Sequence, residues 1–148
     1  MREILFRGQT RRYGEKVNIA GEKLPSNWVY GGIFPQNDGG DFAIVYQQNP
    51  TIEKFMVYAD TVGQYTGVKD NNGTKIFEGD IIQVRFEYDE CDQPTVWYKN
   101  YEVCFDDEYH EWGARMGEYT YNLWVYDRNC IVIGNVYDSP ELLSFKKV

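Results

Sequence analysis

Apolar and polar side chains alternate with a period of two through much of the second half of the chain, as they do in half-buried β-strands. In the clearest run, residues 81–86, the two faces are Ile82, Val84 and Phe86 against Ile81, Gln83 and Arg85. Similar runs, enriched in aromatic residues, predict strands at 96–105, 119–126 and 130–136, with a tight turn at 127–129. We therefore expect a β meander of about five strands.

Shorter runs predict strands in the first half at 2–7, 16–19, 41–46 and 53–59. Residues 21–40 are rich in glycine and proline, which predicts a loop with at most one strand around 28–30. A helix over 51–60 stays open as an alternative, because a short apolar run does not determine its own period.

The segment 68–76 predicts a hairpin, because Asn72-Gly73 tolerates the left-handed backbone that such turns demand. Two segments do not fit a β pattern. Residues 106–118 carry aromatic residues at helical spacing but also two glycines, which predicts a loop or a marginal helix. Residues 138–143 begin with Asp-Ser-Pro-Glu, a typical helix start, and predict a short C-terminal helical turn.

The length of 148 residues fits one domain or two small ones, and we place a boundary between an N-terminal β lobe at 1–60 and a domain at 61–148. Three widely spaced cysteines argue against a disulfide framework. No apolar run reaches the ~18 residues of a membrane span, and we expect a cytoplasmic protein without membrane contact.

The net charge of −8 is unevenly distributed. Residues 1–75 hold nine Lys/Arg and eight Asp/Glu, a balance of +1, whereas residues 76–148 hold six and fifteen, a balance of −9. Such an acidic field repels nucleic acids and anionic membranes wherever no local basic patch outweighs it.

Two stretches, TVGQYTGVKDNNGTKIFEGDII from Thr61 and IGNVYDSPELL from Ile133, together with a weaker match in REILFR from Arg2, resemble the YopX family of phage and prophage proteins. The resemblance implies a mainly β protein with a small SH3-like barrel in its second half, inside a bacterial host cell. It implies no biochemical role and no catalytic residue.

Architectural roles are expected for most residues of these motifs. Glycines would serve turns or bulges, Glu78 and Asp80 would flank a turn before a strand, Pro140 would start the helical turn and Leu142 would cover the end of the barrel. The glycines concerned are Gly67, Gly73, Gly79 and Gly134. Gln64 and Tyr65 are the candidate binding residues of the motif, since a tyrosine on a hairpin can bury its ring and keep its hydroxyl for a partner.

Metal and catalytic sites find little support in the sequence. His110 is the single histidine and stands among Asp106, Asp107, Glu108 and Glu111, but no Cys-x-x-Cys pair and no nucleophile elbow occurs. The carboxylates at 87, 89, 90 and 92 lack the pattern of a calcium loop. We expect no cofactor, no bound metal and no enzymatic activity.

The aromatic content, four Trp, 13 Tyr and eight Phe, favours a binding or assembly module for a protein partner or for self-association, because Tyr and Trp carry much interface energy. Nucleic-acid binding is the second hypothesis. It would use the one basic cluster, Arg2, Arg7, Arg11, Arg12 and Lys16, with Phe6 and Tyr13 interleaved. The third is an acidic DNA mimic that uses the carboxylates between 87 and 111.

Overall fold

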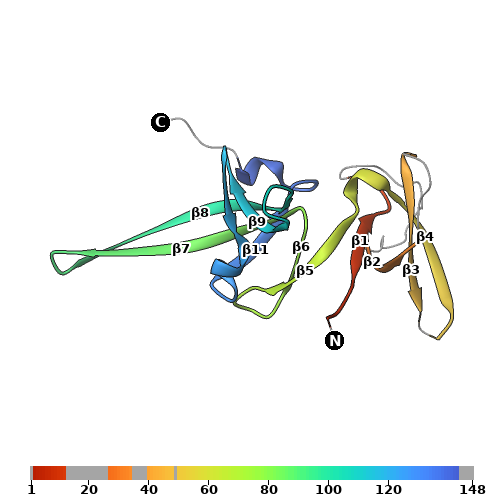
Figure 1. Cartoon of the computed structure of the whole chain (residues 1–148), viewed down its shortest axis with the longest axis horizontal. Helices are drawn as coiled ribbons and strands as arrows, with labels where there is room; N and C mark the ends of the chain where they lie inside the picture. The colour runs from red at the N-terminus through yellow and green to blue at the C-terminus, as the bar shows by residue number, and fades with distance from the viewer. Residues whose placement is uncertain (1, 13–26, 35–39, 49, 144–148) are drawn as a thin grey trace, which may run out of the picture. The chain divides into compact units, whose positions relative to one another are not determined.

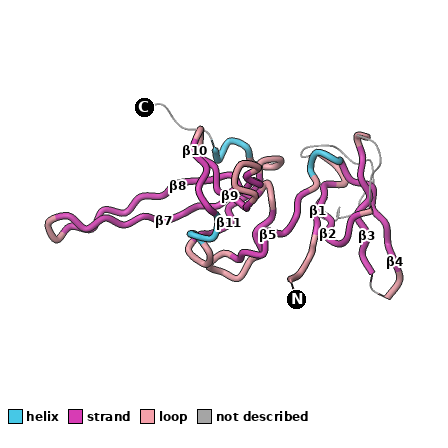
Figure 2. The backbone as a smooth tube through the Cα atoms, in the orientation of Figure 1, coloured by secondary structure: helices cyan, strands magenta, loops and turns pink. Residues whose placement is uncertain are grey.

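The computed structural model describes residues 2–12, 27–34, 40–48 and 50–143. Within these ranges the chain consists of β-strands and three short 3₁₀ turns (Figures 1 and 2). The prediction of a mainly β protein is confirmed. The strand expected at 16–19 lies outside the described residues.

The first strands are β1 (Phe6–Gln9), β2 (Trp28–Ile33), β3 (Phe42–Gln48) and β4 (Ile52–Tyr58). They are followed by the 3₁₀ turn η1 (Ala59–Thr61), β5 (Gly63–Lys69) and β6 (Lys75–Phe77). The remaining elements are β7 (Asp80–Glu90), β8 (Gln93–Asp106), β9 (Glu111–Met116), β10 (Tyr119–Asn122), η2 (Leu123–Tyr126), β11 (Cys130–Asn135) and η3 (Pro140–Leu143).

These strands form two antiparallel sheets with the orders β4-β3-β2-β1-β5-β6 and β10-β9-β8-β7-β11. In the second sheet β7 to β10 are a meander, and β11 returns to pair with β7. Neither sheet closes on itself among the described strands.

The chain divides into two compact units, Met1–Tyr65 and Thr66–Val148, so the division falls within β5. Each unit has its own apolar core. In the first unit the buried residues are Ala43, Val45 and Val57. In the second they are Val68, Ile76, Ile82, Val84, Tyr101, Val103, Ala114, Leu123, Tyr126 and Cys130. Burial of alternate residues on β7 and β8 is what the alternating pattern predicts.

A buried carboxylate connects the β5–β6 turn to β11. Asp70 is 1% exposed, and its Oδ1 accepts hydrogen bonds from the backbone N–H groups of Asn72 (2.9 Å) and Thr74 (2.8 Å). Its Oδ2 accepts a hydrogen bond from the N–H of Val132 (3.0 Å), far along the chain. One side chain therefore closes the turn and attaches it to the edge strand of the second sheet.

Several of the predicted elements differ from the structure. The strand expected at 2–7 is β1, which begins at Phe6 and runs to Gln9. Residues 106–118, expected to be a loop or a marginal helix, contain β9, because Trp112, Ala114 and Met116 alternate toward the core. The strand expected over 119–126 ends at Asn122, whose side-chain oxygen accepts a hydrogen bond from the N–H of Trp124 (2.8 Å) and starts η2. The helical turn expected at the C-terminus is the single 3₁₀ turn η3.

We expect Asp70→Ala to lower the free energy of unfolding by about 3 kcal/mol, because it leaves three backbone donors without their charged acceptor. Asp70→Asn keeps one acceptor oxygen and should be intermediate. Urea denaturation followed by tryptophan fluorescence measures both. Asp89→Ala, at an exposed position on β7, is the matched control and should stay within about 0.5 kcal/mol of the wild type. Equal stability of Asp70→Ala and the control would contradict this role of Asp70.

Candidate interaction surfaces

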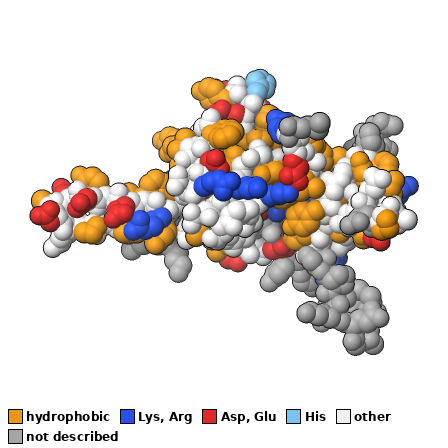
Figure 3. Space-filling view, turned by 90° about the horizontal axis from the view of Figure 1, so that it is seen from below, with side chains coloured by type: hydrophobic (Ala, Val, Ile, Leu, Met, Phe, Trp, Pro, Cys, Tyr) orange, Lys and Arg blue, Asp and Glu red, His pale blue; other side chains and the backbone are white. Residues whose placement is uncertain are grey.

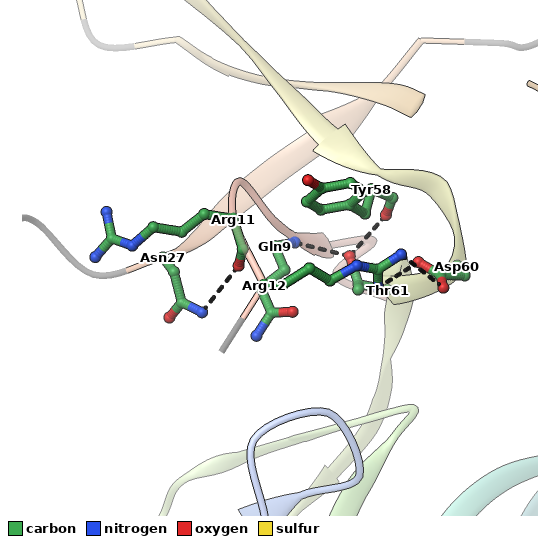
Figure 4. Close-up of polar contacts among 7 residues, drawn as sticks. All are labelled: Gln9, Arg11, Arg12, Asn27, Tyr58, Asp60 and Thr61. Atoms are coloured by element: carbon green, nitrogen blue, oxygen red, sulfur yellow. Dashed lines mark hydrogen bonds and ion pairs between the residues drawn. The ribbon is translucent and has the colours of Figure 1, made fainter. Parts of the chain in front are cut away.

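The N-terminal basic cluster packs largely against its own unit. Arg7 is 5% exposed, and its guanidinium carbon lies 4.6 Å from the centre of the Trp28 ring. Arg12 makes a two-pronged ion pair with Asp60 (2.9 and 3.0 Å) and stacks over Tyr58 at 4.0 Å (Figure 4). Lys16 lies outside the described residues.

Hydrogen bonds around this ion pair hold β1 against η1. The N–H of Gln9 donates to Thr61 Oγ1 (2.9 Å), and the Thr61 hydroxyl donates to the carbonyl of Tyr58 (2.6 Å) (Figure 4). Nearby, the Asn27 amide donates to the carbonyl of Arg11 (3.2 Å). A pocket of about 350 Å³ adjoins the ion pair, lined by Arg12, Gly40, Asp41, Phe42, Tyr58, Ala59 and Asp60.

The two binding candidates of the central motif lie in the sheet. Gln64 pairs with Phe6 across the β1–β5 ladder and is half-buried. Tyr65 is buried, and its N–H donates to the carbonyl of Leu5 (2.8 Å). Neither side chain lines the pocket beside the Arg12–Asp60 ion pair, the one beside Arg85 and Arg128, or the one beside Ile44 and Met56.

The other motif residues make contacts within the fold. Gly79 has φ +90°, and a Cβ there would lie 3.0 Å from the Tyr137 ring. Asp80 Oδ2 accepts a hydrogen bond from the N–H of Phe77 (2.8 Å), across the half-buried Glu78. Gly67 and Gly73 also have positive φ, Gly134 packs against Leu142 beside a bulge of β11, and Pro140 begins η3.

The outer half of the β7–β8 hairpin has no strand beside it. β11 pairs with β7 up to Val84, and β9 pairs with β8 from Glu102 onward. Among the described pairings, residues 85–90 and 93–98 are joined to each other alone. Figures 1 and 2 show this segment continuing past the other strands of its sheet. We call it the arm.

Aromatic residues cover the arm on the face that continues the core. Phe86 and Trp97 stack with ring centres 5.7 Å apart, and the Lys99 ammonium lies 5.5 Å from the Phe86 ring. Tyr88 follows toward the tip and is 55% exposed. Exposed rings of this kind are typical of protein interfaces, since they bring large apolar area at low entropic cost.

Acidic residues mark the end of the arm. Its last turn is Glu90-Cys91-Asp92-Gln93, in which Cys91 (φ 55°) and Asp92 (φ 61°) both adopt the left-handed backbone of a tight hairpin turn. Figure 3 shows acidic and hydrophobic side chains next to one another at this end of the hairpin. Alternation along the chain does not single out the arm as a surface; its sequence signal is the aromatic residues on both sides of the turn, Tyr88 and Trp97.

The groups with perturbed pKa values lie in the core or in surface ion pairs. Burial raises the pKa of Tyr101 and that of the Cys104 thiol, and it raises the pKa of Cys130 to about 11. The hydrogen bond from Arg115 to Glu102 raises the pKa of that guanidinium. A thiol with a raised pKa is a poor nucleophile, because the thiolate is the reactive form.

In the described part of the chain, no group of three or more His, Cys, Asp or Glu side chains is placed to hold a metal ion.

Comparison with known proteins gives a family match and a similarity to a solved structure. The family model described as YopX protein matches residues 28–144. The crystal structure of protein EF1440 from Enterococcus faecalis is 21% identical, covers 96% of this chain and 99% of that chain, and has a TM-score of 0.49. No curated protein matches. Within the described ranges, no helix has the length and hydrophobicity needed to cross a bilayer.

We expect the three thiols to react at very different rates with Ellman's reagent at pH 8. Cys91 is exposed and should react first, Cys104 slowly, and Cys130 after unfolding, since a thiol of pKa about 11 is ionised in about one molecule in a thousand. Cys91→Ser should remove the fast phase. Three equal rates in the native protein would contradict this order.

The arm should contribute little to global stability. Trp97→Ser should lower the free energy of unfolding by about 1 kcal/mol or less, the value of one aromatic pair. Tyr101→Ala on the same strand removes a core ring and should cost about 3–5 kcal/mol. Urea denaturation of both variants measures the difference, and similar losses would show that the arm belongs to the core.

Proposed function

The chain belongs to the YopX family, and we propose that it is a non-enzymatic binding or assembly module that engages a protein partner, or a second copy of itself, through the β7–β8 arm. The observation that carries this proposal is the aromatic face of the arm, on which Phe86 and Trp97 stack across the two strands and Tyr88 follows toward the tip, with Tyr88 and Trp97 exposed.

The chemistry of the arm supports a protein partner. Its rings lie on a backbone that the hairpin holds in place, so a partner would bury them at low entropic cost. The carboxylates at its tip, among them Asp89 and Asp92, would favour a partner with a basic rim, through faster association. The burial of Arg7 and the Arg12–Asp60 ion pair leave the N-terminal cluster with less charge to offer a nucleic acid.

The proposal includes two expectations from the family. The first is an SH3-like barrel in the second unit, supported by its five-stranded order and by the return of β11 beside β7. The second is a phage or prophage setting in a bacterial cytoplasm, supported by the family match alone.

The test removes the aromatic surface and leaves the core intact. In the double variant Tyr88→Ser with Trp97→Ser, the affinity for a second copy or for the partner should fall by about 30-fold or more, because two interface aromatics are removed. Sedimentation velocity measures self-association, and capture from cells that carry the gene measures partner binding. Photo-crosslinking from Cys91, at the tip, locates the contact on the partner.

Tyr119→Ser is the control, since Tyr119 is an exposed tyrosine on β10 of the same sheet, away from the arm. It should bind like the wild type. The proposal is wrong if the wild type is a strict monomer without a partner, or if the arm variant binds as tightly as the control.

A further inference from the structure

A groove of about 420 Å³ opens on the second unit, at the base of the arm, whose innermost pair, Arg85 and Tyr98, helps to line it. Strands β7 and β8 contribute Gln83, Arg85 and Tyr98 from the outer face of the sheet, and two turns contribute Asn71, Arg128 and Asn129. Val84, Cys130 and Ile131 complete the lining. Two arginines and three side-chain amides line this groove and no carboxylate does, within a unit whose residues 76–148 carry a balance of −9.

Backbone hydrogen bonds bring the contributing turns together. The N–H of Arg128 donates to the carbonyl of Lys69 (3.0 Å), and the N–H of Asn71 donates to the carbonyl of Cys130 (2.8 Å). The pairing of Cys130 with Val84 places Arg85 beside the same turn. The groove is therefore formed before any ligand arrives.

Arg128 occupies a backbone position that suits glycine. Asp127 (φ −54°, ψ 119°) and Arg128 (φ 59°) are the central residues of a type II turn, closed by a hydrogen bond from the N–H of Asn129 to the carbonyl of Tyr126 (2.9 Å). The second central residue of such a turn needs a positive φ and is ordinarily Gly or Asn. A strained arginine at the edge of a groove points to a use for its side chain.

Both guanidinium groups have donors to offer. Arg128 is exposed and makes no ion pair or side-chain hydrogen bond with the described residues. Arg85 forms one exposed ion pair with Glu87 (3.0 Å) and also interacts with the side chain of Tyr98. An exposed pair of this kind is weak, and a guanidinium has five N–H donors, so an incoming oxyanion can still be bound.

We propose that this groove binds the phosphate of a nucleotide, with Arg85 and Arg128 donating to the phosphate oxygens and the Tyr98 ring stacking on the base. The same chemistry takes a free nucleotide or a nucleotide within a single strand. The site goes beyond the proposed function and does not depend on the partner of the arm.

The volume of the groove, the exposed ring of Tyr98 and the acidity of the surrounding unit favour a nucleotide over a bare anion or a long duplex. The volume is that of a small-molecule site, larger than phosphate alone requires. Tyr98 is 58% exposed and stands directly opposite Arg85, a combination of ring and cation typical of sites that hold single-stranded bases. The surrounding acidity repels an extended polyanion, so the salt dependence should reflect about one or two phosphates.

Titration of the ¹⁵N-labelled full chain tests the proposal with four probes: AMP, adenosine, inorganic phosphate and a short oligothymidylate, at constant ionic strength. AMP should shift the side-chain amide signals of Asn71, Gln83 and Asn129. Adenosine and phosphate should each bind at least about tenfold more weakly, since each lacks one half of the contacts. The oligothymidylate distinguishes a strand from a free nucleotide.

Arg128→Gly separates binding from folding. This variant should raise the melting temperature, because glycine adopts the left-handed backbone without strain, and it should weaken the binding of AMP by about tenfold or more. Arg85→Gln should weaken AMP binding to a similar extent. Tyr98→Phe should still bind AMP, whereas Tyr98→Ser should not. Arg115→Gln, an arginine of the same sheet that pairs with Glu102, is the control and should leave binding unchanged.

Four outcomes would overturn the proposal. They are equal binding of adenosine and AMP, full binding by Arg128→Gly, binding of a phosphotyrosine peptide in place of nucleotides, and unchanged amide signals with every probe. The double arm variant should bind AMP normally, so failure of this site and failure of the proposed function are distinguishable.

Discussion

The second unit depends on a carboxylate that the fold removes from water. Asp70 is held by three backbone N–H groups, and removing a charge from water is tolerated where such donors replace it. Because two of the donors belong to its own turn and one to β11, the turn and the edge strand keep a single relative position. That position also places Asn71 and Arg128 on one groove, so the buried Asp70 shapes a groove that its own neighbour in the signature stretch helps to line.

The length of the β7–β8 hairpin is the second constraint. Among the described strands, neighbours support only its inner half, and an isolated two-stranded ribbon is marginal in water. The Phe86–Trp97 stack and the Lys99 contact supply local support for the outer half. The carboxylates near the tip keep two free strand edges from pairing at random, which is the usual use of charge on exposed edges. The same short segment thus combines the aromatic surface for which we propose docking with charges that oppose aggregation.

The alternation of apolar and polar residues predicted β7, β8 and β11, because one face of each strand is buried. The pattern was misleading where a spacing fits both the helical and the strand period. Trp112 and Met116 are four residues apart, a spacing that satisfies both a helix and a strand, and the buried Ala114 between them decides for the strand. The groove was beyond reach for a different reason. Nothing in the sequence relates Arg85 to Arg128, and it is the Cys130–Val84 register that brings them together.

Backbone conformation distinguishes the residues that serve the fold from those that serve the surface. Where the motifs need a positive φ, at Gly73 and Gly79, the chain uses glycine, the residue with no steric penalty. Among the described residues the same conformation is occupied by Cys91 and Asp92 at the arm tip, by Arg128 at the groove and by His110 between β8 and β9. Asp and His adopt it more readily than most other side chains, so Asp92 and His110 need no reason beyond the turn. Cys91 and Arg128 lack that tolerance, and they lie on the two surfaces for which we propose a partner.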